Sequence, residues 1–408
     1  MKKRLVITGM GAVTPVGLNV KEYWEALKDG RTVIDKINKF DTENYSVKVA
    51  AEVKGFSAED YMPKKLVREL DPFMQYAFAA ADEALSDSGL EIEPGNTGIV
   101  LGTAMNGVTS IGEAQTELAE KGAPKRVSPR LVPKYIGNIG AAQIAIAKNI
   151  TGPSMTVSTA CSSGVDALTL AAMFIESGAS DAMIAVGADS AITPVIVAAL
   201  ANAKALSTNP DPKTACRPFD LNRNGFVMGE GGGAVIIETE EHAKARGAKI
   251  YAELAGYANN TDGYHVTSPH PDGIGAVKCM TEALEKADMD KSEIKYINTH
   301  GTSTHSGDII EVKAIKSTFG ENAPLISSTK SATGHLMGAG GITETIACVM
   351  AVREGVIPPT LNYETPDPDC GLNCVPNAAV KTDVGAAMSN AFGFGGQNAS
   401  VIVKRYEG

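Results

Sequence analysis

The sequence has 408 residues, of which 44% are hydrophobic and 21% charged, and a net charge of −10. This length is enough for a large buried core, and the composition is typical of a globular protein. The acidic balance argues against binding to nucleic acids or anionic membranes, and no apolar stretch is long enough to cross a membrane. We therefore expect a cytoplasmic protein without disulfides, because its six cysteines show no paired spacing.

Strand-like apolar segments alternate with helical segments along the chain. The predicted strands are 4–8, 97–102, 154–159, 182–187, 233–238, 295–299, 324–328, 387–391 and 399–404. The predicted helices are 21–28, 74–88, 162–177, 277–286, 309–319 and 342–353. This alternation predicts an α/β fold with buried sheets. Residues 4–9 and 250–256 each resemble the opening strand of a half, so we expect halves at 1–249 and 250–408.

Cys161 lies where a predicted strand meets a predicted helix, among small residues. Most buried cysteines only fill space in a core, and this remains one interpretation. A thiol at a helix N-terminus faces the positive end of the helix dipole, which lowers its pKa and favours the nucleophilic thiolate. The N–H groups at that end can also hold a developing oxyanion.

Two of the six histidines occupy comparable positions. His300 follows the strand 295–299, and His335 lies with Lys330 in a glycine-rich turn before the helix 342–353. Taken alone, either histidine could equally well have a structural role instead of a catalytic one. The turn lacks both phosphate-binding glycine motifs, and the spacing of the Cys and His residues does not suggest zinc. One cysteine with two such histidines fits acyl transfer.

Six segments, in this order along the chain, resemble one family. They are VITGMGAVTPVG near the start, TACSSG at 159–164, NPDPKTACRPFDLNRNGFVMGEG at 209–231, NTHGTST at 298–304, SSTKSATGHLMGAGG at 327–341 and SNAFGFGGQNA at 389–399. The chain resembles the β-ketoacyl-[acyl-carrier-protein] synthases, the condensing enzymes of fatty-acid synthesis, and among them the type II enzymes. The resemblance implies an α/β thiolase fold, with two similar halves in five αβαβα layers, and a homodimer.

The resemblance also implies a mechanism. Cys161 would take an acyl chain from a carrier-protein thioester, with the N–H groups of Cys161 and Phe394 as oxyanion hole. His300 and His335 would promote decarboxylation of the malonyl thioester, and Lys330 would set the electrostatics. Glu344 would order water and His335. The carbanion would then attack the acyl-cysteine in a Claisen condensation that releases CO₂ and a carrier-bound 3-ketoacyl product.

Further positions match residues of that family with other roles. Those expected to contact substrate are Thr302 and Thr304 at the pantetheine arm, Met105 and Leu200 at the acyl-pocket wall, and Phe392. Phe394 matches the gate that moves as the acyl chain loads. Those expected to bind the acidic acyl carrier protein are Lys65, Arg68, Lys125, Arg126 and Lys204. No cofactor is required, but a structural K⁺ or Na⁺ ion is expected at Asn298, Glu344, Ser389 and Asn390.

The sequence departs from the family after Thr304, where His305, Ser306 and Gly307 replace a more usual proline-containing stretch. We do not expect His305 to be catalytic. A thiolase would have a second catalytic cysteine late in the chain, and a silent partner subunit would lack Cys161. A ketosynthase of a polyketide or specialised lipid pathway remains the alternative, because the motifs separate it poorly from a fatty-acid enzyme.

Overall fold

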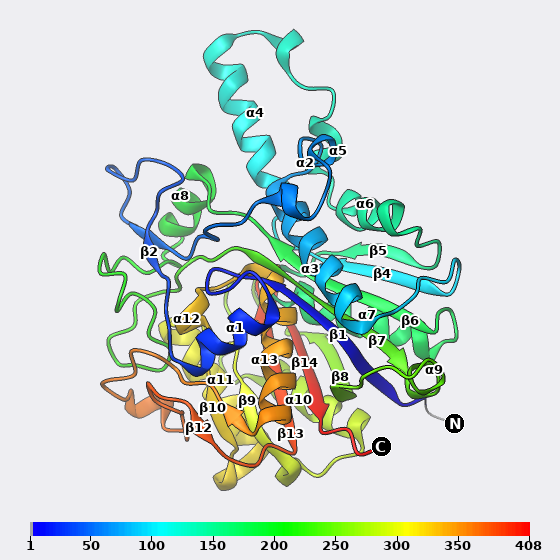
Figure 1. The fold of residues 1–408 in the computed structure, drawn as a ribbon. Coiled ribbons are helices and arrows are strands. Elements are labelled where there is room, and N and C mark those ends of the chain that lie inside the picture. Colours follow the sequence, from blue (N-terminus) through cyan, green and yellow to red (C-terminus); the bar gives the residue numbers. More distant parts are fainter. Residues whose placement is uncertain (1–2) are drawn as a thin grey trace.

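The computed structural model describes residues 3–408, which form a main sheet of ten strands in the order β10-β9-β13-β14-β8-β1-β7-β6-β4-β5 (Figure 1). Its strands are β1 (Leu5–Val13), β4 (Thr97–Gly102), β5 (Ser154–Val157), β6 (Ala182–Asp189), β7 (Gly231–Thr239), β8 (Ala252–Thr261), β9 (Ile294–Asn298), β10 (Leu325–Ser327), β13 (Ala386–Gly393) and β14 (Gln397–Lys404). Two small sheets pair β2 (Asp35–Lys36) with β3 (Val49–Ala50) and β11 (Val356–Ile357) with β12 (Val380–Lys381).

Helices cover this sheet on several sides. They are α1 (Val20–Lys28), α2 (Lys64–Val67), α3 (Pro72–Ser88), α4 (Val108–Lys121), α5 (Leu131–Tyr135), α6 (Asn138–Lys148), α7 (Ser163–Glu176), α8 (Pro194–Asn202), α9 (Glu240–Ala245), α10 (Ile274–Ala287), α11 (His305–Phe319), α12 (Lys330–Thr333) and α13 (Gly340–Glu354). No helix within residues 3–408 is long and apolar enough to span a bilayer.

The two halves of the main sheet share one topology. The strands β1, β4, β5, β6 and β7 are arranged as β5-β4-β6-β7-β1, and β8, β9, β10, β13 and β14 repeat that arrangement as β10-β9-β13-β14-β8. In each half the first three strands of this order are parallel and the next two pairings are antiparallel. The halves join where β1 pairs with β8 over three residues.

Helices and half-sheets stack in five layers. α7 and α13 lie between the halves and contact strands of both. α3 and α6 cover the outer face of the first half, whereas α10 covers that of the second and packs against α11. The predicted α/β fold of two similar halves in αβαβα layers is therefore confirmed.

Glycines let α7 and α13 touch at their N-terminal ends. A Cβ on Gly164 would lie 2.6 Å from the carbonyl oxygen of Gly338, and one on Gly341 would lie 2.6 Å from the backbone nitrogen of Val165. No side chain fits at such distances, so the two backbones are in direct contact. This contact brings the segment before α7 against the turn before α13.

Each predicted strand and helix corresponds to an element of the structure, with ends that differ by a few residues. The sequence analysis missed several helices, among them α6, α8 and α4, and α4 stands out from the body of the molecule (Figure 1) and buries only Ser110. Its apolar residues Val108, Ile111 and Leu118 recur at helical spacing, but none of the three is buried. The boundary between residues 249 and 250 falls between α9 and β8 and stays a prediction.

Candidate active site

Three loops bring one thiol and two imidazoles together. Cys161 lies in the short helix η3 (Ala160–Ser162) after β5, His300 follows β9, and His335 lies between α12 and the short helix η6 (Met337–Ala339). The Cys161 sulfur and one ring nitrogen of each histidine lie within 4.8 Å of one another. The predicted cluster therefore exists, in a crevice at the carboxyl ends of parallel strands.

Hydrogen bonds hold His335 in one tautomer. The Met337 N–H donates to His335 Nδ1 at 3.3 Å, which assigns the ring proton to Nε2. Nε2 lies 3.0 Å from Cys161 Sγ and donates to it. Met337 presents its N–H from the left-handed region, with φ of 53°, an uncommon conformation outside glycine. His335 therefore acts on the sulfur as a neutral donor.

Burial dominates the acidity of the thiol. It raises the pKa of Cys161 to about 12, whereas the Lys330 charge and the Phe394 N–H lower it. This corrects the expectation of a lowered pKa, because Cys161 lies in η3, ahead of α7, and is only 8% exposed. The thiolate therefore depends on donors at Sγ, which His335 and Phe394 supply.

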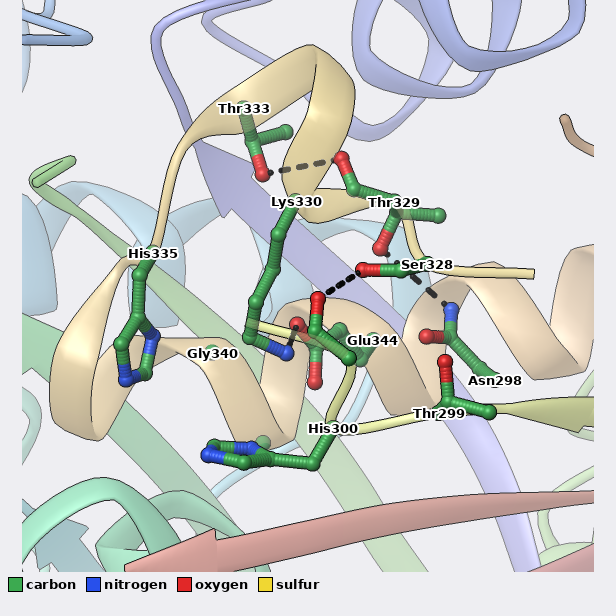
Figure 2. Close-up of polar contacts among 12 residues, drawn as sticks. Asn298, Thr299, His300, Ser328, Thr329, Lys330, Thr333, His335, Gly340 and Glu344 are labelled. Carbon is green, nitrogen blue, oxygen red and sulfur yellow. Dashed lines mark hydrogen bonds and ion pairs between the residues drawn. The ribbon is translucent and has the colours of Figure 1, made fainter. Parts of the chain in front are cut away.

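A buried ion pair sets the charge of the site. Lys330 Nζ lies 2.5 Å from Glu344 Oε1, and neither side chain is more than 5% exposed. Figure 2 shows Lys330 extending from α12 toward Glu344, with the rings of His300 and His335 nearby. The pKa of both histidines lies well below its usual range, mainly because the rings are buried and also because the Lys330 charge is close. Both rings are consequently neutral at pH 7.

Glu311, on α11, fixes the position of His300 and was missed by the sequence analysis. Its carboxylate accepts the N–H of His300 at 2.8 Å and that of Gly301 at 2.7 Å. Burial raises the pKa of Glu311 to about 7. The only signal in the sequence is an acidic residue within the predicted helix 309–319, which is also typical of a solvated helix surface.

The glycine-rich loop after β13 closes over Cys161. A Cβ on Gly393 would lie 2.9 Å from the carbonyl oxygen of Thr159 and 3.0 Å from the Cys161 nitrogen, so only glycine fits. The next residue, Phe394, directs its N–H at Cys161 Sγ. The structure thus places both expected oxyanion donors, the N–H groups of Cys161 and Phe394, at the nucleophile.

A cavity of about 280 Å³ opens onto Cys161 and both histidines. The expected substrate-binding residues Thr302, Thr304 and Phe392 line it, and so does Phe394, the residue expected at the gate. The hydroxyls of the two threonines lie 3.0 Å apart. Met105 and Leu200 do not line this cavity and instead pack in an adjoining apolar cluster with Phe394.

The unusual residues after Thr304 form the first turn of α11 rather than a loop, and they lie at the rim of this cavity. Ser306 and Gly307 line the cavity, whereas His305 begins α11 and is exposed. Its carbonyl oxygen accepts from Arg223 Nη2 at 2.8 Å. His305 therefore lies outside the Cys–His–His cluster.

The expected carrier-binding residues are all exposed, and the structure places them in two areas. Lys65 and Arg68 belong to α2 and its end, and Lys125 and Arg126 belong to the short helix η2 (Pro124–Arg126) beyond α4. Arg68 and Arg126 line a shared groove of about 270 Å³. Lys204, after α8, instead lines the cavity that contains Cys161.

The four residues expected to bind a cation meet between β9, β13 and α13, and two of them have oxygens that suit a monovalent ion. Asn298 Oδ1 and Ser389 Oγ are buried without a hydrogen-bond partner among the described residues, as oxygen ligands of a cation would be. Asn298 and Ser389 are also register partners. The side chain of Asn390 is engaged by Ser400, and Glu344 by Lys330. The two unpaired oxygens are therefore the candidate ligands.

Comparisons with known proteins agree with this geometry. Residues 2–243 match the family described as "Beta-ketoacyl synthase, N-terminal domain", and residues 251–364 match its C-terminal domain. The chain is 45% identical to a 3-oxoacyl-[acyl-carrier-protein] synthase 2 of Staphylococcus aureus and 46% identical to one of Vibrio cholerae, over 99% of each chain.

Solved structures show the same fold. The ishigamide ketosynthase/chain length factor superposes with a TM-score of 0.94 at 33% identity, and all of both chains is covered. The ketosynthase AntDE, solved with its type II polyketide acyl carrier protein AntF, superposes with a TM-score of 0.92 at 31% identity, also over all of both chains.

Proposed function

The chain belongs to the β-ketoacyl synthase family, and we propose that it is a 3-oxoacyl-[acyl-carrier-protein] synthase of fatty-acid elongation. The observation that carries this proposal is the Cys161 sulfur, 3.0 Å from a His335 nitrogen and open to a cavity that also contains His300. In such an enzyme these three residues, with Lys330, Glu344 and Phe394, form the catalytic group.

The first half-reaction moves an acyl chain to Cys161. The sulfur attacks the thioester carbonyl, and the N–H groups of Cys161 and Phe394 hold the oxyanion. The carrier thiolate leaves and takes up the proton that the thiol has lost. Donation from His335 Nε2 to Sγ stabilises the sulfur while it carries negative charge. The product is an acyl-cysteine and a free carrier thiol.

The second half-reaction forms the new carbon–carbon bond. Neutral His300 and His335 donate to the thioester oxygen of the malonyl group, so the electrons left by CO₂ departure collect on that oxygen. The enolate carbon attacks the acyl-cysteine carbonyl. Collapse of the resulting oxyanion expels the Cys161 thiolate, which is then reprotonated. The product is a 3-ketoacyl chain on the carrier.

The proposal includes the acyl carrier protein, loaded with an acyl or a malonyl group, as partner. Thr302 and Thr304 line the cavity and offer hydroxyls to its pantetheine arm. The exposed cations Lys65, Arg68, Lys125, Arg126 and Lys204 suit an acidic partner. A cytoplasmic location belongs to the same proposal, and cell fractionation tests it.

A monovalent cation and a homodimer complete the proposal. No cofactor is required for the chemistry, but K⁺ or Na⁺ held by Asn298 and Ser389 would satisfy two buried oxygens and stiffen the pairing of β9 with β13. The dimer would form at the free edge strand β5, around which several apolar side chains are exposed, namely Val132, Tyr135, Ile136, Ile146 and Met155.

The structural similarity to polyketide ketosynthases favours one second candidate, a ketosynthase of a polyketide pathway. Intact-mass measurement after mixing the protein with acyl carrier proteins of several chain lengths separates the two. A gain of one saturated acyl group, absent in Cys161→Ala, is the result expected for fatty-acid elongation. Acylation by polyketide intermediates alone favours the second candidate, and no acylation by any carrier contradicts both.

A further inference from the structure

We propose that Asp189 is a positioning residue that ties the acyl-pocket wall to the turn carrying His335, and so helps to determine acyl-chain length. This inference rests on the proposed function. Asp189 ends β6, is fully buried and is no part of the Cys–His–His cluster. Its carboxylate accepts hydrogen bonds from four uncharged donors, which belong to two segments far apart in the sequence.

One segment is residues 103–105, the expected acyl-pocket wall. Asp189 Oδ1 accepts the Thr103 hydroxyl at 2.8 Å and the Met105 N–H at 2.9 Å, and Oδ2 accepts the Ala104 N–H at 2.9 Å. Met105 does not line the cavity at Cys161, but its side chain packs in the apolar cluster that contains Leu200, Met337 and Phe394, and the last two residues do line that cavity. The backbone that carries this wall residue is therefore held by Asp189.

The other segment is the catalytic turn. Oδ2 of Asp189 also accepts the Gly338 N–H at 2.6 Å. Gly338 follows Met337, whose left-handed backbone directs its N–H to His335 Nδ1. A Cβ on Gly338 would lie 2.6 Å from that Oδ2, so the approach is possible only for glycine. Asp189 thereby holds Gly338, the residue next to Met337, whose N–H fixes the tautomer of His335.

Because one carboxylate joins the two segments, an acyl chain that displaces Met105 acts on the same group that holds the His335 turn. A chain of fitting length leaves all four hydrogen bonds in place. A longer chain pushes the wall and strains them. Chain-length preference is thus linked to the geometry of the donor at Cys161.

The variant Asp189→Asn separates the two connections. Its amide keeps one acceptor oxygen, and its NH₂ group must face at least one backbone N–H. If the amide oxygen takes the place of Oδ2, the NH₂ group takes the place of Oδ1 and faces Thr103 and Met105. The Thr103 hydroxyl can then rotate and accept from the NH₂ group, so only the Met105 N–H loses its acceptor. In the reverse orientation, the N–H groups of both Ala104 and Gly338 lose their acceptor. The first orientation costs less, so the variant loosens the wall and keeps the turn.

The experiment measures kcat/KM for acylation of Cys161 across carrier-bound chains of different length, together with malonyl-carrier decarboxylation, which uses the histidines. For Asp189→Asn we expect the long-to-short chain ratio to change by about fivefold or more, with decarboxylation within about twofold of wild type. The matched control is Glu83→Gln on the outer helix α3, which removes one acceptor from a half-buried carboxylate that accepts the N–H groups of Ala12 and Val20.

An unchanged chain-length ratio in a folded Asp189→Asn protein overturns the inference, as does an equal change in Glu83→Gln. If Asp189→Asn does not fold, Thr103→Val tests the same point, since it removes the hydroxyl donor on the wall side, together with the acceptor that this hydroxyl offers to the Asn106 N–H. An unchanged ratio in that variant then overturns it. Failure of the wild-type protein to accept any acyl chain would instead contradict the proposed function.

Discussion

Lys330 and Glu344 are the residues whose charges most directly affect the site. The ammonium is buried, and its field lowers the pKa of His300 and of His335 beyond what burial alone does. Both rings need to be neutral donors for decarboxylation. The pair therefore protects the working protonation state of the histidines against falling pH.

The variant Lys330→Met tests this role. Without the positive charge the pKa of both histidines rises, so decarboxylation should fall at a higher pH than in wild type as the medium is acidified. The unpaired Glu344 carboxylate should also lower the free energy of unfolding by about 3–5 kcal/mol. A pH–rate profile and a urea titration measure the two effects.

The double variant Lys330→Met/Glu344→Gln is the control. It removes the unpaired carboxylate and should recover part of the stability while keeping the shifted pH profile. An acid limb that stays at the wild-type pH in both variants contradicts the electrostatic role of Lys330.

The reacting residues could be predicted from the sequence, but the residues that hold them could not. Cys161, His300 and His335 lie in short motifs with small neighbours at the ends of strands, and such motifs can be recognised from the sequence alone. Glu311 and Asp189 are acids whose neighbours do not distinguish them from solvated charges. Their role consists of accepting backbone N–H groups, for Glu311 from the segment just before its own helix and for Asp189 from segments far away in the sequence, and only the fold sets these contacts.

At the scale of elements, continuous apolar runs made the strands predictable, whereas their order was not. Periodicity contains no information on pairing, so the sequence could not place β1 beside β8 or β13 beside β9. It also could not show that α4 projects from the body of the molecule, or that Arg68 and Arg126 line one groove.

The groove between α2 and η2 leads to a prediction about the carrier protein. Arg68→Glu combined with Arg126→Glu should raise KM for the carrier substrate by about tenfold at low salt, leave kcat nearly unchanged and flatten the salt dependence of kcat/KM. Steady-state kinetics at several ionic strengths measure this. Lys278→Glu, an exposed charge reversal on α10, is the control, and an equal effect there argues against a specific surface.

The pairing of β9 with β13 leads to a prediction about the cation. Melting temperature should be a few degrees higher in KCl or NaCl than in choline chloride of the same ionic strength, because an ion that binds only the folded state stabilises it. Ser389→Ala should abolish the difference. Without a bound cation, this variant removes an unpaired buried hydroxyl and should not destabilise the protein. Equal melting temperatures in all salts contradict the cation proposal.

At the scale of the whole molecule, the site belongs to neither half alone. Cys161 comes from the first half, whereas His300, Lys330 and His335 come from the second. The glycine contact between α7 and α13 sets how the two sets of residues meet. The two halves therefore form one asymmetric site, to which the first half contributes the thiol and the second half the histidines.

The free edge of the sheet leads to a prediction about assembly. β5 has a partner strand on one side only, and unpaired edges with apolar surroundings favour association with another chain. Val132 and Ile146 are 61% and 75% exposed near this edge. We therefore expect light scattering at micromolar concentration to give twice the 42.5 kDa of one chain.

The double variant Val132→Asp/Ile146→Asp should shift this equilibrium to the monomer, because each carboxylate would have to be desolvated in the interface. Val380→Asp, which alters an exposed apolar residue of β12, should leave the dimer intact. Since β5 leads directly into η3 and Cys161, loss of the partner should also slow acylation of the thiol. A wild-type protein that stays monomeric throughout the micromolar range removes the dimer from the proposal.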